Sequence, residues 1–364
     1  MKLQRAVAEI SLKNLSSNLE LVRKKTGDQN ILAVVKADAY GHGAVEVSKH
    51  LLKNKVTMLG VACASEGVEL REAGIKAPIV VFFDTKNIDA FIEYNLRPVV
   101  FDLSIAKKIS LAAARKKKLV PIHIKIDTGM GRVGFDPESA LKDVPKIAAL
   151  SNIKLEGIMS HFSEADLKDK RFANQQIKLF NHVINSLKEK HIIFKYIHMA
   201  NSAAVLTLPK SHFNMVRPGI MLYGYGCCEN EKLKPVMSIR SKVLFVKSVP
   251  EGTPISYSRT FITKRKSAIA TIPFGYADGY DRRLSNIGKA IINGKFAPVA
   301  GRVCMDSFMA DVTNIPNVTQ KSEVILIGSK GKNRITAQDI ADQIGTISYE
   351  VLTSIGKRVE RVYK

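Results

Sequence analysis

The stretch Ile31-Leu32-Ala33-Val34-Val35-Lys36, followed by ADAYGHG at residues 37–43, decides the fold. It is a short apolar run that ends on a lysine and passes into a glycine-containing turn. Such a run is typical of a strand buried in a parallel sheet. Seven more strand-like runs follow it, namely Met58–Ala62, Ile79–Phe83, Arg97–Phe101, Pro121–Asp127, Leu155–Ser160, Tyr196–Ala200 and Asn214–Arg217.

Most segments between these runs are long enough for a helix and show helical spacing. One of them, Leu167–Lys188, places five apolar side chains near one face, namely Leu167, Phe172, Ile177, Phe180 and Leu187. Eight strands that alternate with helices fit a (β/α)8 barrel of the TIM type better than an open doubly wound sheet, which periodicity alone does not exclude. The Gly-x-Gly-x-x-Gly signature of a dinucleotide site is missing after the first strand.

The sequence changes in character after Gly226, where turn signals such as Pro250–Gly252 and Asn293–Gly294 separate short strand-like runs. These runs are Ser238–Val249, Ala268–Phe274, Ala290–Ile292, Pro298–Val303 and Glu323–Ile327. A short helix is expected over Thr336–Ile344, with Asp339 at the capping-box offset from its cap Thr336.

We therefore expect two domains in this chain of 364 residues. The first is a (β/α)8 barrel over residues 1–230, whose first residues are candidates to pair with the second domain. The second is a mainly β domain over residues 231–364, and Cys227–Lys234 is interpreted as the linker.

The formal net charge of +23 is the one unusual bulk property. The lysines are spread through both halves, and the densest run, Arg115–Lys118, has no aromatic or glycine interleaving of the kind that favours nucleic acid. A solvated basic surface is the favoured interpretation, and no nucleic-acid partner is expected.

Neither a membrane nor a metal is indicated by the sequence. No apolar run approaches the roughly 20 residues that span a bilayer, and the start MKLQRAVAEISL has no signal core. The four cysteines (Cys63, Cys227, Cys228 and Cys304) have no metal-type spacing. This pattern predicts reduced thiols in a cytoplasm and no metal site.

Barrel enzymes carry their chemistry at the carboxyl ends of the strands, and Lys36 stands at the first of these ends. A lysine is costly to bury as a cation unless it is paired or neutral. A neutral lysine amine is a nucleophile that forms a Schiff base with an aldehyde. The alternative is a lysine that extends from the strand end to solvent, and Lys36 taken alone favours that alternative.

Other strand ends supply groups that suit a phosphate and an aromatic ring. Gly219 and Ile220 can present backbone N–H groups to a phosphate, with Ser202 and Tyr40 as hydroxyl donors. Arg217 stays protonated, so it would donate a hydrogen bond to a pyridine nitrogen and leave that nitrogen unprotonated. Each has an ordinary alternative, which is a simple turn for the glycine and a surface ion pair for the arginine.

Three further residues need their context to become functional. Arg132, in a glycine-rich loop, suits bidentate binding of a carboxylate, and His161 can lie against a flat ring. His198 is better explained as a core residue. Tyr257 becomes a general base if a nearby cation lowers its pKa from about 10, although most strand tyrosines only pack.

The order of these motifs resembles that of the alanine racemases, which are pyridoxal-phosphate enzymes with a barrel and a β domain that act as homodimers. The resemblance covers nearly the whole chain, and it is highly specific because seven long blocks recur in order. The blocks are VVKADAYGHG, KIDTGMGRVG, MANSAA, MVRPGIMLYG, IPFGYADGY, GRVCMDSFMADVT and ISYEVLTSIGKRVERVY.

The resemblance implies a role for each matching residue of this chain. Lys36 resembles the lysine that holds pyridoxal 5′-phosphate as an aldimine, and Tyr257 resembles an opposing base supplied by the other subunit. Arg132 and the backbone of Met305 look like the contacts to the substrate carboxylate. Arg217 matches the partner of the pyridine nitrogen.

The remaining matches surround the ring, the phosphate and the entrance. His161 is similar to the histidine beside the ring, and Lys125 to a lysine that is carbamylated in some members and would then balance Arg132. The phosphate-binding set would be Tyr40, Ser202, Gly219, Ile220 and Tyr349. The substrate entrance would be formed by Asp166, Tyr276, Arg282, Arg302 and Tyr349.

The resemblance implies an isomerase that interconverts L-alanine and D-alanine in the cytoplasm and supplies D-alanine for peptidoglycan. Racemisation removes the α-proton from one face and returns a proton to the other, so two opposed bases avoid moving a single base across the substrate. We expect Lys36 to take the proton of the D-enantiomer and Tyr257 that of the L-enantiomer.

Two positions depart from the family pattern, and three other functions stay open. Ser258 replaces the usual glycine after the tyrosine, and Glu164 stands where the entrance commonly has a small residue. A racemase for serine or basic amino acids would use the same groups. A related barrel decarboxylase would normally protonate the pyridine nitrogen through a carboxylate, which Arg217 argues against. A non-catalytic pyridoxal-phosphate carrier would have the barrel alone.

Overall fold

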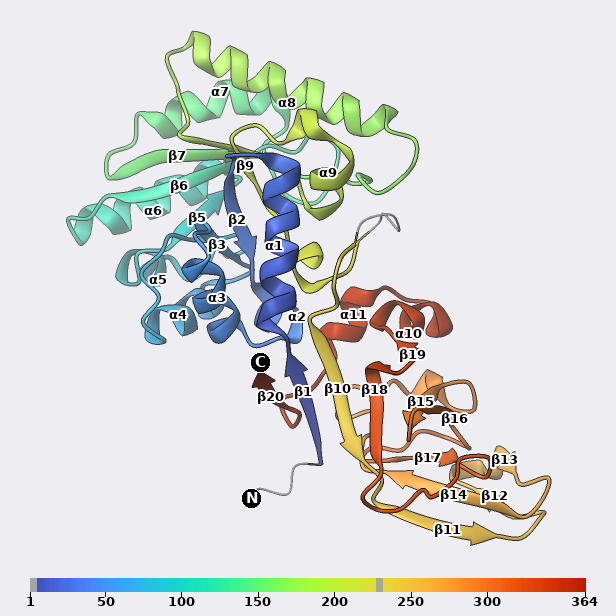
Figure 1. Ribbon diagram of the computed structural model, residues 1–364. Coiled ribbons are helices and arrows are strands. Elements are labelled where there is room, and N and C mark those ends of the chain that lie inside the picture. The colour runs from blue at the N-terminus through green and yellow to red at the C-terminus, as the bar shows by residue number, and fades with distance from the viewer. Residues whose placement is uncertain (1–4, 227–231) are drawn as a thin grey trace. The chain divides into compact units, whose positions relative to one another are not determined.

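The eight strand-like runs of the first part of the chain close into a parallel barrel with the order β2-β3-β4-β5-β6-β7-β8-β9 (Figure 1). Closure comes from the pairing of β2 with β9, in which Asn30 lies opposite Met215 and Ile31 opposite Val216. The (β/α)8 prediction is confirmed, and the open sheet is excluded. The strands are β2 (Asn30–Val34), β3 (Met58–Val61), β4 (Ile79–Val81), β5 (Arg97–Val100), β6 (Val120–Lys125), β7 (Ile153–Met159), β8 (Tyr196–His198) and β9 (Met215–Val216).

This computed structural model describes residues 5–226 and 232–364, and the chain divides into two units. The barrel unit consists of Ser16–Ala39 and the described residues of Ala44–Lys234. The β unit consists of the described residues before Ser16, of Tyr40–Gly43 and of Pro235–Lys364. Most of the expected linker, with Cys227 and Cys228, lies outside the described residues.

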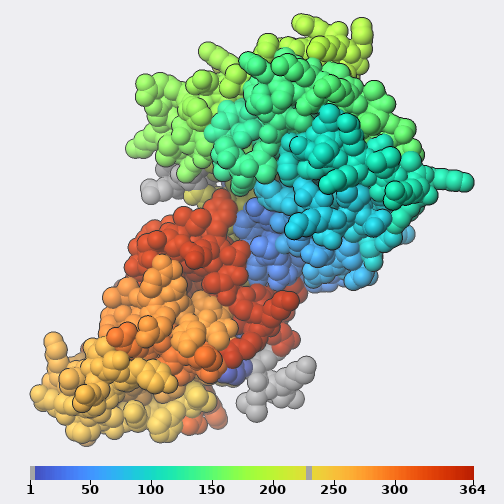
Figure 2. Space-filling view, turned by 180° about the vertical axis from the view of Figure 1, so that it is seen from behind, coloured from blue at the N-terminus to red at the C-terminus, as the bar shows by residue number. Residues whose placement is uncertain are grey.

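The barrel strands β3 and β4 are apolar and buried along their whole length, as is expected of parallel strands that helices cover from outside. In the space-filling view the segments coloured blue through green form one continuous surface of the barrel unit (Figure 2). The helices of this part of the chain are α1 (Leu12–Thr26), α3 (Ala44–Lys53), α4 (Ala64–Glu72), α5 (Ile88–Glu93), α6 (Leu103–Arg115), α7 (Pro137–Ala148), α8 (Arg171–Glu189) and α9 (Ser202–Thr207), with the 3-10 turns η1 (Pro209–Ser211) and η2 (Ile220–Tyr223).

The helix expected from Leu167 begins only at Arg171. Leu167 and Phe172 are 51% and 37% exposed, whereas the other three apolar side chains of the expected face are buried. Before the helix, the Lys170 ammonium donates to the Ala165 carbonyl at 2.7 Å and so satisfies a carbonyl outside any helix. The amphipathic pattern therefore placed the predicted start of this helix about one turn too early.

The chain leaves β2 through an uncommon left-handed turn, α2 (Lys36–Gly41). Four consecutive non-glycine residues have φ between 52° and 55°, namely Ala37, Asp38, Ala39 and Tyr40. This conformation costs an L-residue roughly 1–2 kcal/mol, so surrounding contacts must hold it. The Ala37 N–H donates to Glu66 Oε1 at 2.7 Å, and the Ala44 N–H donates to Asp38 Oδ1 at 2.7 Å.

The β unit contains three sheets, which confirms the mainly β second domain. The largest has the order β16-β15-β18-β10-β1-β20, with β19 paired to β18, and β11-β14-β17 and β12-β13 form the others. Strand β1 pairs antiparallel with β10 and parallel with β20. The strands are β1 (Ala6–Ile10), β10 (Met237–Lys242), β11 (Phe245–Val249), β12 (Pro254–Ile255), β13 (Phe261–Ile262), β14 (Ser267–Ile272), β15 (Lys289–Ile292), β16 (Lys295–Pro298), β17 (Phe308–Asp311), β18 (Glu323–Lys330), β19 (Asn333–Ile335) and β20 (Glu360–Tyr363).

Two of the strand predictions for the β unit need correction. The run Ser238–Val249 is divided between β10 and β11, which belong to different sheets. The run Pro298–Val303 is wrong as a strand, because β16 ends at Pro298 and the chain turns at Gly301 with φ of 85°. A Cβ at Gly301 would lie 2.6 Å from the Ile255 carbonyl oxygen, so this close approach requires glycine.

Local turn and cap signals were reliable in the same unit. Asn293 and Gly294 have φ of 48° and 77° and join β15 to β16, as a type I′ turn requires. The Thr336 side chain accepts from the Asp339 N–H, and the Asp339 side chain accepts from the Thr336 N–H, which forms the expected capping box. The helical elements here are α10 (Ala337–Ile344), α11 (Ser348–Thr353), η3 (Tyr257–Arg259) and η4 (Arg282–Leu284).

Candidate active site

The site residues predicted for the barrel unit lie at or after the carboxyl ends of its strands, where barrel enzymes carry their chemistry. They are Lys36 after β2, Lys125 at the end of β6, Arg132 in the following loop, His161 and Asp166 after β7, Ser202 at the start of α9, and Arg217, Gly219 and Ile220 after β9.

Phe83 brings two of these side chains together. Lys36 Nζ lies 5.8 Å from the centroid of the Phe83 ring, and Arg132 Cζ lies 4.7 Å from it. An aromatic face attracts cations at such distances. The sequence reasoning missed Phe83, although its place directly after β4 was a signal that it stands on the same rim.

The surroundings of Lys36 favour the neutral form of its amine over the cation. Burial is the main cause that lowers its pKa, the Arg132 charge lowers it further, and the Glu66 carboxylate opposes both. Glu66 was also missed by the sequence reasoning. Its Oε1 accepts from the Ala37 N–H and its Oε2 from the Ala62 N–H at 2.6 Å, so it bridges the chain just beyond β2 and β3.

Arg217 is buried and held from several directions. Its Nη2 donates to the Ser160 carbonyl at 2.7 Å and to the Met199 carbonyl at 3.1 Å. Its Nη1 contacts His198 Nδ1 at 3.2 Å. Burial, followed by the Arg132 charge, lowers the pKa of Arg217 to about 9, so the guanidinium remains a cation at neutral pH.

His161 lies beside Arg217 and is neutral. Its Nδ1 is 3.0 Å from Arg217 Nη2, and because a guanidinium only donates, the imidazole nitrogen accepts, sharing an Nη2 hydrogen with one of the two carbonyls. Burial, then the charges of Arg217 and Lys125, hold the pKa of His161 well below its ordinary value. Its remaining nitrogen therefore carries the proton.

Lys125 is buried with its amine against the chain, since Nζ donates to the Ile126 carbonyl at 2.9 Å. Burial is the largest cause that lowers its pKa to about 7, and the Arg217 and Arg132 charges add to this effect. A substantial fraction of this amine is therefore unprotonated at neutral pH, next to two cations.

Ser202 and the start of η2 form a cradle of donors. The Ser202 Oγ accepts from the Gly219 N–H at 2.9 Å and from the Met221 N–H at 3.3 Å. Since both of these bonds use the oxygen as an acceptor, the hydroxyl proton remains available to an anion. Ser202 and Ile220 are both buried, so such an anion would be shielded from bulk water.

Tyr257 and Met305 lie on one face of the β unit. They line an open hollow of about 530 Å³ with Ser256, Cys304, Asp306 and Ser307, and they are 68% and 53% exposed. The Met305 carbonyl accepts from the Ala277 N–H at 3.1 Å. Within residues 5–226 and 232–364, the Met305 N–H donates to no other group, which leaves it for a ligand.

The backbone around Tyr257 is strained. Ser256 has φ of 65° and ψ of −174°, and Ser258 has φ of 60°. Ser258 is the residue that replaces the usual glycine, and its left-handed backbone explains why glycine suits this position. The Ser256 Oγ donates to the Arg302 carbonyl at 2.7 Å, which ties the segment to the next loop.

The expected phosphate and entrance sets are divided between the two units. In the β unit, the rings of Tyr40 and Tyr349 have centroids 5.9 Å apart, and burial raises the pKa of Tyr40 so that it stays a donor. The Tyr276 N–H donates to the Cys304 carbonyl at 3.1 Å, beside Met305. Arg282 is exposed in η4, Arg302 is half-buried, and Asp166 is exposed in the barrel unit.

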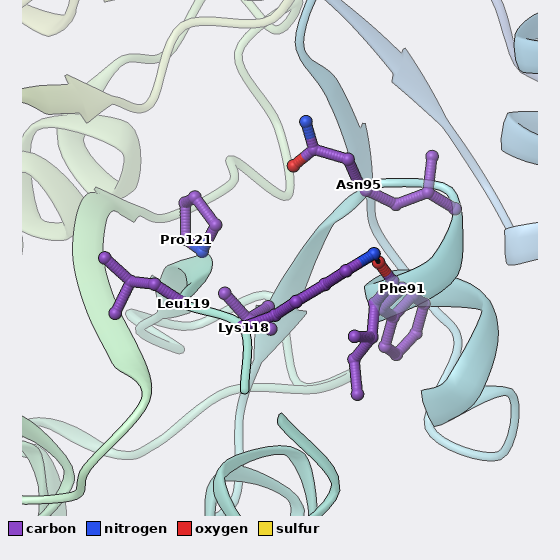
Figure 3. A pocket seen from close by; sticks show the side chains of 8 residues that line it. Phe91, Asn95, Lys118, Leu119 and Pro121 are labelled. Atoms are coloured by element: carbon purple, nitrogen blue, oxygen red, sulfur yellow. Dashed lines mark hydrogen bonds between the residues drawn. The ribbon is translucent and has the colours of Figure 1, made fainter. Parts of the chain in front are cut away.

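A separate pocket of about 280 Å³ lies at the opposite end of the barrel strands, between the end of α5 and the start of β6 (Figure 3). Lys118 extends along it, and its Nζ donates to the Ile92 carbonyl at 3.3 Å. The pocket is lined by Phe91, Ile92, Asn95, Leu96, Lys118, Leu119, Val120 and Pro121. None of the predicted site residues lies there.

The described parts of the chain contain neither a cluster of metal ligands nor a membrane-spanning helix. No group of three or more His, Cys, Asp or Glu side chains within residues 5–226 and 232–364 could hold a metal ion. Over the same residues, no helix combines the length and apolar character needed to cross a bilayer.

Comparisons with known proteins confirm the resemblance. The model of the alanine racemase N-terminal domain matches residues 10–226, and that of the alanine racemase C-terminal domain matches residues 236–363. The alanine racemase of Clostridium novyi (strain NT) is 47% identical over 98% of this chain and 94% of its own length.

Solved structures agree with the sequence relatives. The alanine racemase of Clostridium difficile 630 has a TM-score of 0.95 at 38% identity and covers 99% of this chain and 95% of its own. An alanine racemase from Bartonella henselae with covalently bound pyridoxal phosphate has a TM-score of 0.89 at 28% identity, with 99% of each chain covered. This chain belongs to the alanine racemase family.

Proposed function

We propose that this protein interconverts L-alanine and D-alanine with pyridoxal 5′-phosphate as its cofactor, and that it supplies D-alanine for peptidoglycan in the cytoplasm. The observation that carries the proposal is a lysine of lowered pKa, Lys36, on the rim that also bears the buried cation Arg217. Family membership gives the substrate, and these side chains give the chemistry.

The residues of the barrel unit fit the cofactor in three respects. An aldehyde needs a neutral amine, and the lowered pKa of Lys36 favours that form. A phosphate needs donors, which the Ser202 hydroxyl and the Ile220 N–H offer, since the Gly219 N–H already donates to Ser202 Oγ. The resemblance assigns Gly219, Tyr40 and Tyr349 to the same group. A pyridine nitrogen needs a donor that keeps its own proton, and Arg217 is such a donor.

Bound pyridoxal 5′-phosphate would supply the electron-withdrawing ring that makes the α-proton of an attached amino acid acidic. The protein supplies the rest. Lys36 Nζ holds the cofactor and takes the proton from D-alanine, whereas the Tyr257 oxygen takes it from L-alanine. Arg132 and the Met305 N–H bind the substrate carboxylate, and His161 lies beside the ring.

Tyr257 is assigned to the active site of a second copy of the chain, which makes the protein a homodimer. The exposure of the Tyr257 side chain supports this assignment. At 68% exposed, the side chain lies in no enclosed site of its own unit. Proton transfer needs a site from which water is largely excluded. Asp166, Tyr276, Arg282, Arg302 and Tyr349 would line the entrance for alanine, with Glu164 near it.

Lys125 is proposed as a site of carbamylation. A neutral amine adds carbon dioxide, so that a nitrogen–carbon bond forms and a proton leaves to solvent. The product is an anion, and the charges of Arg217 and Arg132 that lower the pKa of Lys125 would favour it. Carbon-13 bicarbonate should give a carbamate resonance that disappears in Lys125→Met.

The function is tested by a racemisation assay with added cofactor over alanine, serine, lysine and arginine. Alanine should be the best substrate in both directions, and borohydride should fix the cofactor to the peptide that contains Lys36. Recovery of the label on another lysine would overturn the cofactor site. Faster turnover of a basic amino acid would instead favour the broader racemase.

A further inference from the structure

The interior of the barrel contains an unexpected column of polar side chains. Barrels of this type are usually filled by layers of branched apolar residues. Here β6 contributes His123 and β8 contributes His198, both fully buried, and β7 contributes Glu156. Buried polar groups destabilise a fold unless they are paired, so the partners of this column indicate its purpose.

The column is continuous with Arg217. Arg217 Nη1 contacts His198 Nδ1 at 3.2 Å, and His198 Nε2 contacts His123 Nδ1 at 2.8 Å. His123 Nε2 then lies 3.5 Å from Glu156 Oε2, and Arg97 Nε lies 3.5 Å from the same oxygen. The line therefore runs from the carboxyl end of β9 to Arg97, the first residue of β5 at the opposite end of the barrel.

Two local features of β7 build this column. Ile122 pairs with Leu155 while His123 pairs with Gly157, so Glu156 is an extra residue in a bulge. Bulges are rare between parallel strands, and they re-aim a side chain. A Cβ at Gly157 would lie 2.4 Å from His123 Nδ1, so the glycine makes room for the ring.

The chemistry of the two ends determines where the protons lie. Arg217 can only donate, so His198 Nδ1 accepts and His198 carries its proton on Nε2. That proton is donated to His123 Nδ1, and the His123 Nε2 proton then faces the Glu156 carboxylate. This proton order has one proton on each ring. Burial lowers the pKa of His123, although Glu156 opposes this effect, and burial holds the pKa of His198 well below its ordinary value.

We propose that His198, His123 and Glu156 form a positioning relay for Arg217. The relay fixes the plane of the guanidinium. It also places the negative charge of Glu156 at the end of the relay farthest from Arg217, so that Arg217 keeps its proton when it faces the ring nitrogen of the cofactor. Arg97 Nε, 3.5 Å from Glu156 Oε2, places a positive charge beside that carboxylate. The inference rests on the proposed role of Arg217, and it adds residues that touch neither substrate nor cofactor.

Two substitutions of Glu156 separate its charge from its polarity. Glu156→Gln keeps a polar oxygen opposite His123 Nε2 but removes the charge. Glu156→Leu removes both, so the His123 proton faces no polar group at Nε2 and is expected to move to Nδ1. His198 must then carry its proton on Nδ1, against the Arg217 donor. Glu189→Gln, on the exposed face of α8, is the matched control.

The first measurement is the ring nitrogen spectrum of the full-length holoenzyme labelled with nitrogen-15 histidine, assigned with His123→Asn and His198→Asn. Both rings should be neutral with the proton on Nε2 between about pH 6 and pH 8. Glu156→Leu should change the His198 spectrum, whereas Glu189→Gln should not. An imidazolium in the wild type, or an unchanged His198 in Glu156→Leu, would overturn the relay.

The second measurement is the ratio of pyruvate released to alanine racemised. Pyruvate arises when the amino group of alanine passes to the cofactor, a side reaction that protonation of the ring nitrogen promotes. If loss of the distant charge makes Arg217 more acidic by about one pKa unit, this ratio should rise about tenfold in Glu156→Gln. An unchanged ratio would show that the charge does not act on Arg217. A wild type that racemises nothing would reject the proposed function but leave the spectra interpretable.

Discussion

Lys36 and Tyr257, the two proposed bases, stand in contrasting surroundings. Lys36 follows a buried barrel strand, with its backbone fixed by a left-handed turn and its amine surrounded by Phe83, Arg132 and Glu66. Tyr257 is 68% exposed on the β unit, in the short and strained turn η3. The barrel unit is organised in advance, whereas the β unit presents a group that still needs a partner surface.

The contrast predicts different losses when each base is removed. Lys36→Ala should abolish cofactor fixation and lower racemisation by about 10⁴-fold or more. Tyr257→Phe should lower turnover of L-alanine by about 10³-fold while cofactor fixation stays near the wild-type level. The measurements are borohydride trapping and deuterium exchange from each enantiomer in heavy water.

A matched control for the lysine is Lys49→Ala, since Lys49 is exposed on α3 and pairs only with the neighbouring Glu46. It should leave both trapping and exchange unchanged. Near wild-type exchange from L-alanine in Tyr257→Phe would contradict the assignment of two bases.

Mixing the two inactive variants tests whether Tyr257 serves a second copy. In a mixed dimer, one site has lost both bases and the other has kept both. Random exchange of subunits should therefore restore activity to about a quarter of the wild-type value, because half of the dimers are mixed and each has one intact site. If both bases came from the same chain, mixing would restore nothing.

The same contrast explains how much the sequence alone could predict. The eight barrel strands were recognisable because each is a buried apolar run, and the polar residue that ends each run follows from the geometry of parallel strands. Phe83 and Glu66 were missed because their functional contacts are made through space to Lys36 and Ala37, far away in the sequence. No local pattern marks such contacts.

The β unit was harder to predict for a physical reason. Its strands are short and change sheets, so the single run Ser238–Val249 gave no sign of the division between β10 and β11. Tyr257 was indistinguishable from a packing tyrosine until the resemblance to a family supplied its role. His198 was expected to be a core residue, and it is one, but its contact with Arg217 gives it a further purpose.

The buried amine of Lys125 in the barrel unit predicts that the stability of the protein depends on pH. The pKa of Lys125 is about 7 in the folded protein, below the ordinary value of a lysine in an unfolded chain. Between these two values the unfolded state binds more protons, so the stability of the wild type rises with pH. Lys125→Met lacks this titrating group. The free energy of unfolding of the wild type minus that of Lys125→Met should therefore rise by up to about 1.4 kcal/mol per pH unit.

This difference is measured by urea unfolding of both proteins between about pH 7 and pH 9, in buffers free of carbon dioxide so that no carbamate forms. Lys36 has the same direction of shift but is present in both proteins, so its effect cancels. A difference that is constant over this range would mean that the Lys125 amine is not neutral in the folded state.

The smallest predicted effect is a change in stability at Ser258, next to the exposed Tyr257 of the β unit. Its φ of 60° is strained for serine and ordinary for glycine. Ser258→Gly should therefore stabilise the protein by about 0.5–1 kcal/mol, since relief of strain outweighs the greater freedom of glycine in the unfolded chain. Ser186→Gly, within the regular helix α8, should do the opposite by a similar amount, and thermal unfolding measures both. If Ser258→Gly destabilised the protein as Ser186→Gly does, the strain beside Tyr257 would already be relieved by contacts in the assembled dimer, and the β unit would be as well organised as the barrel.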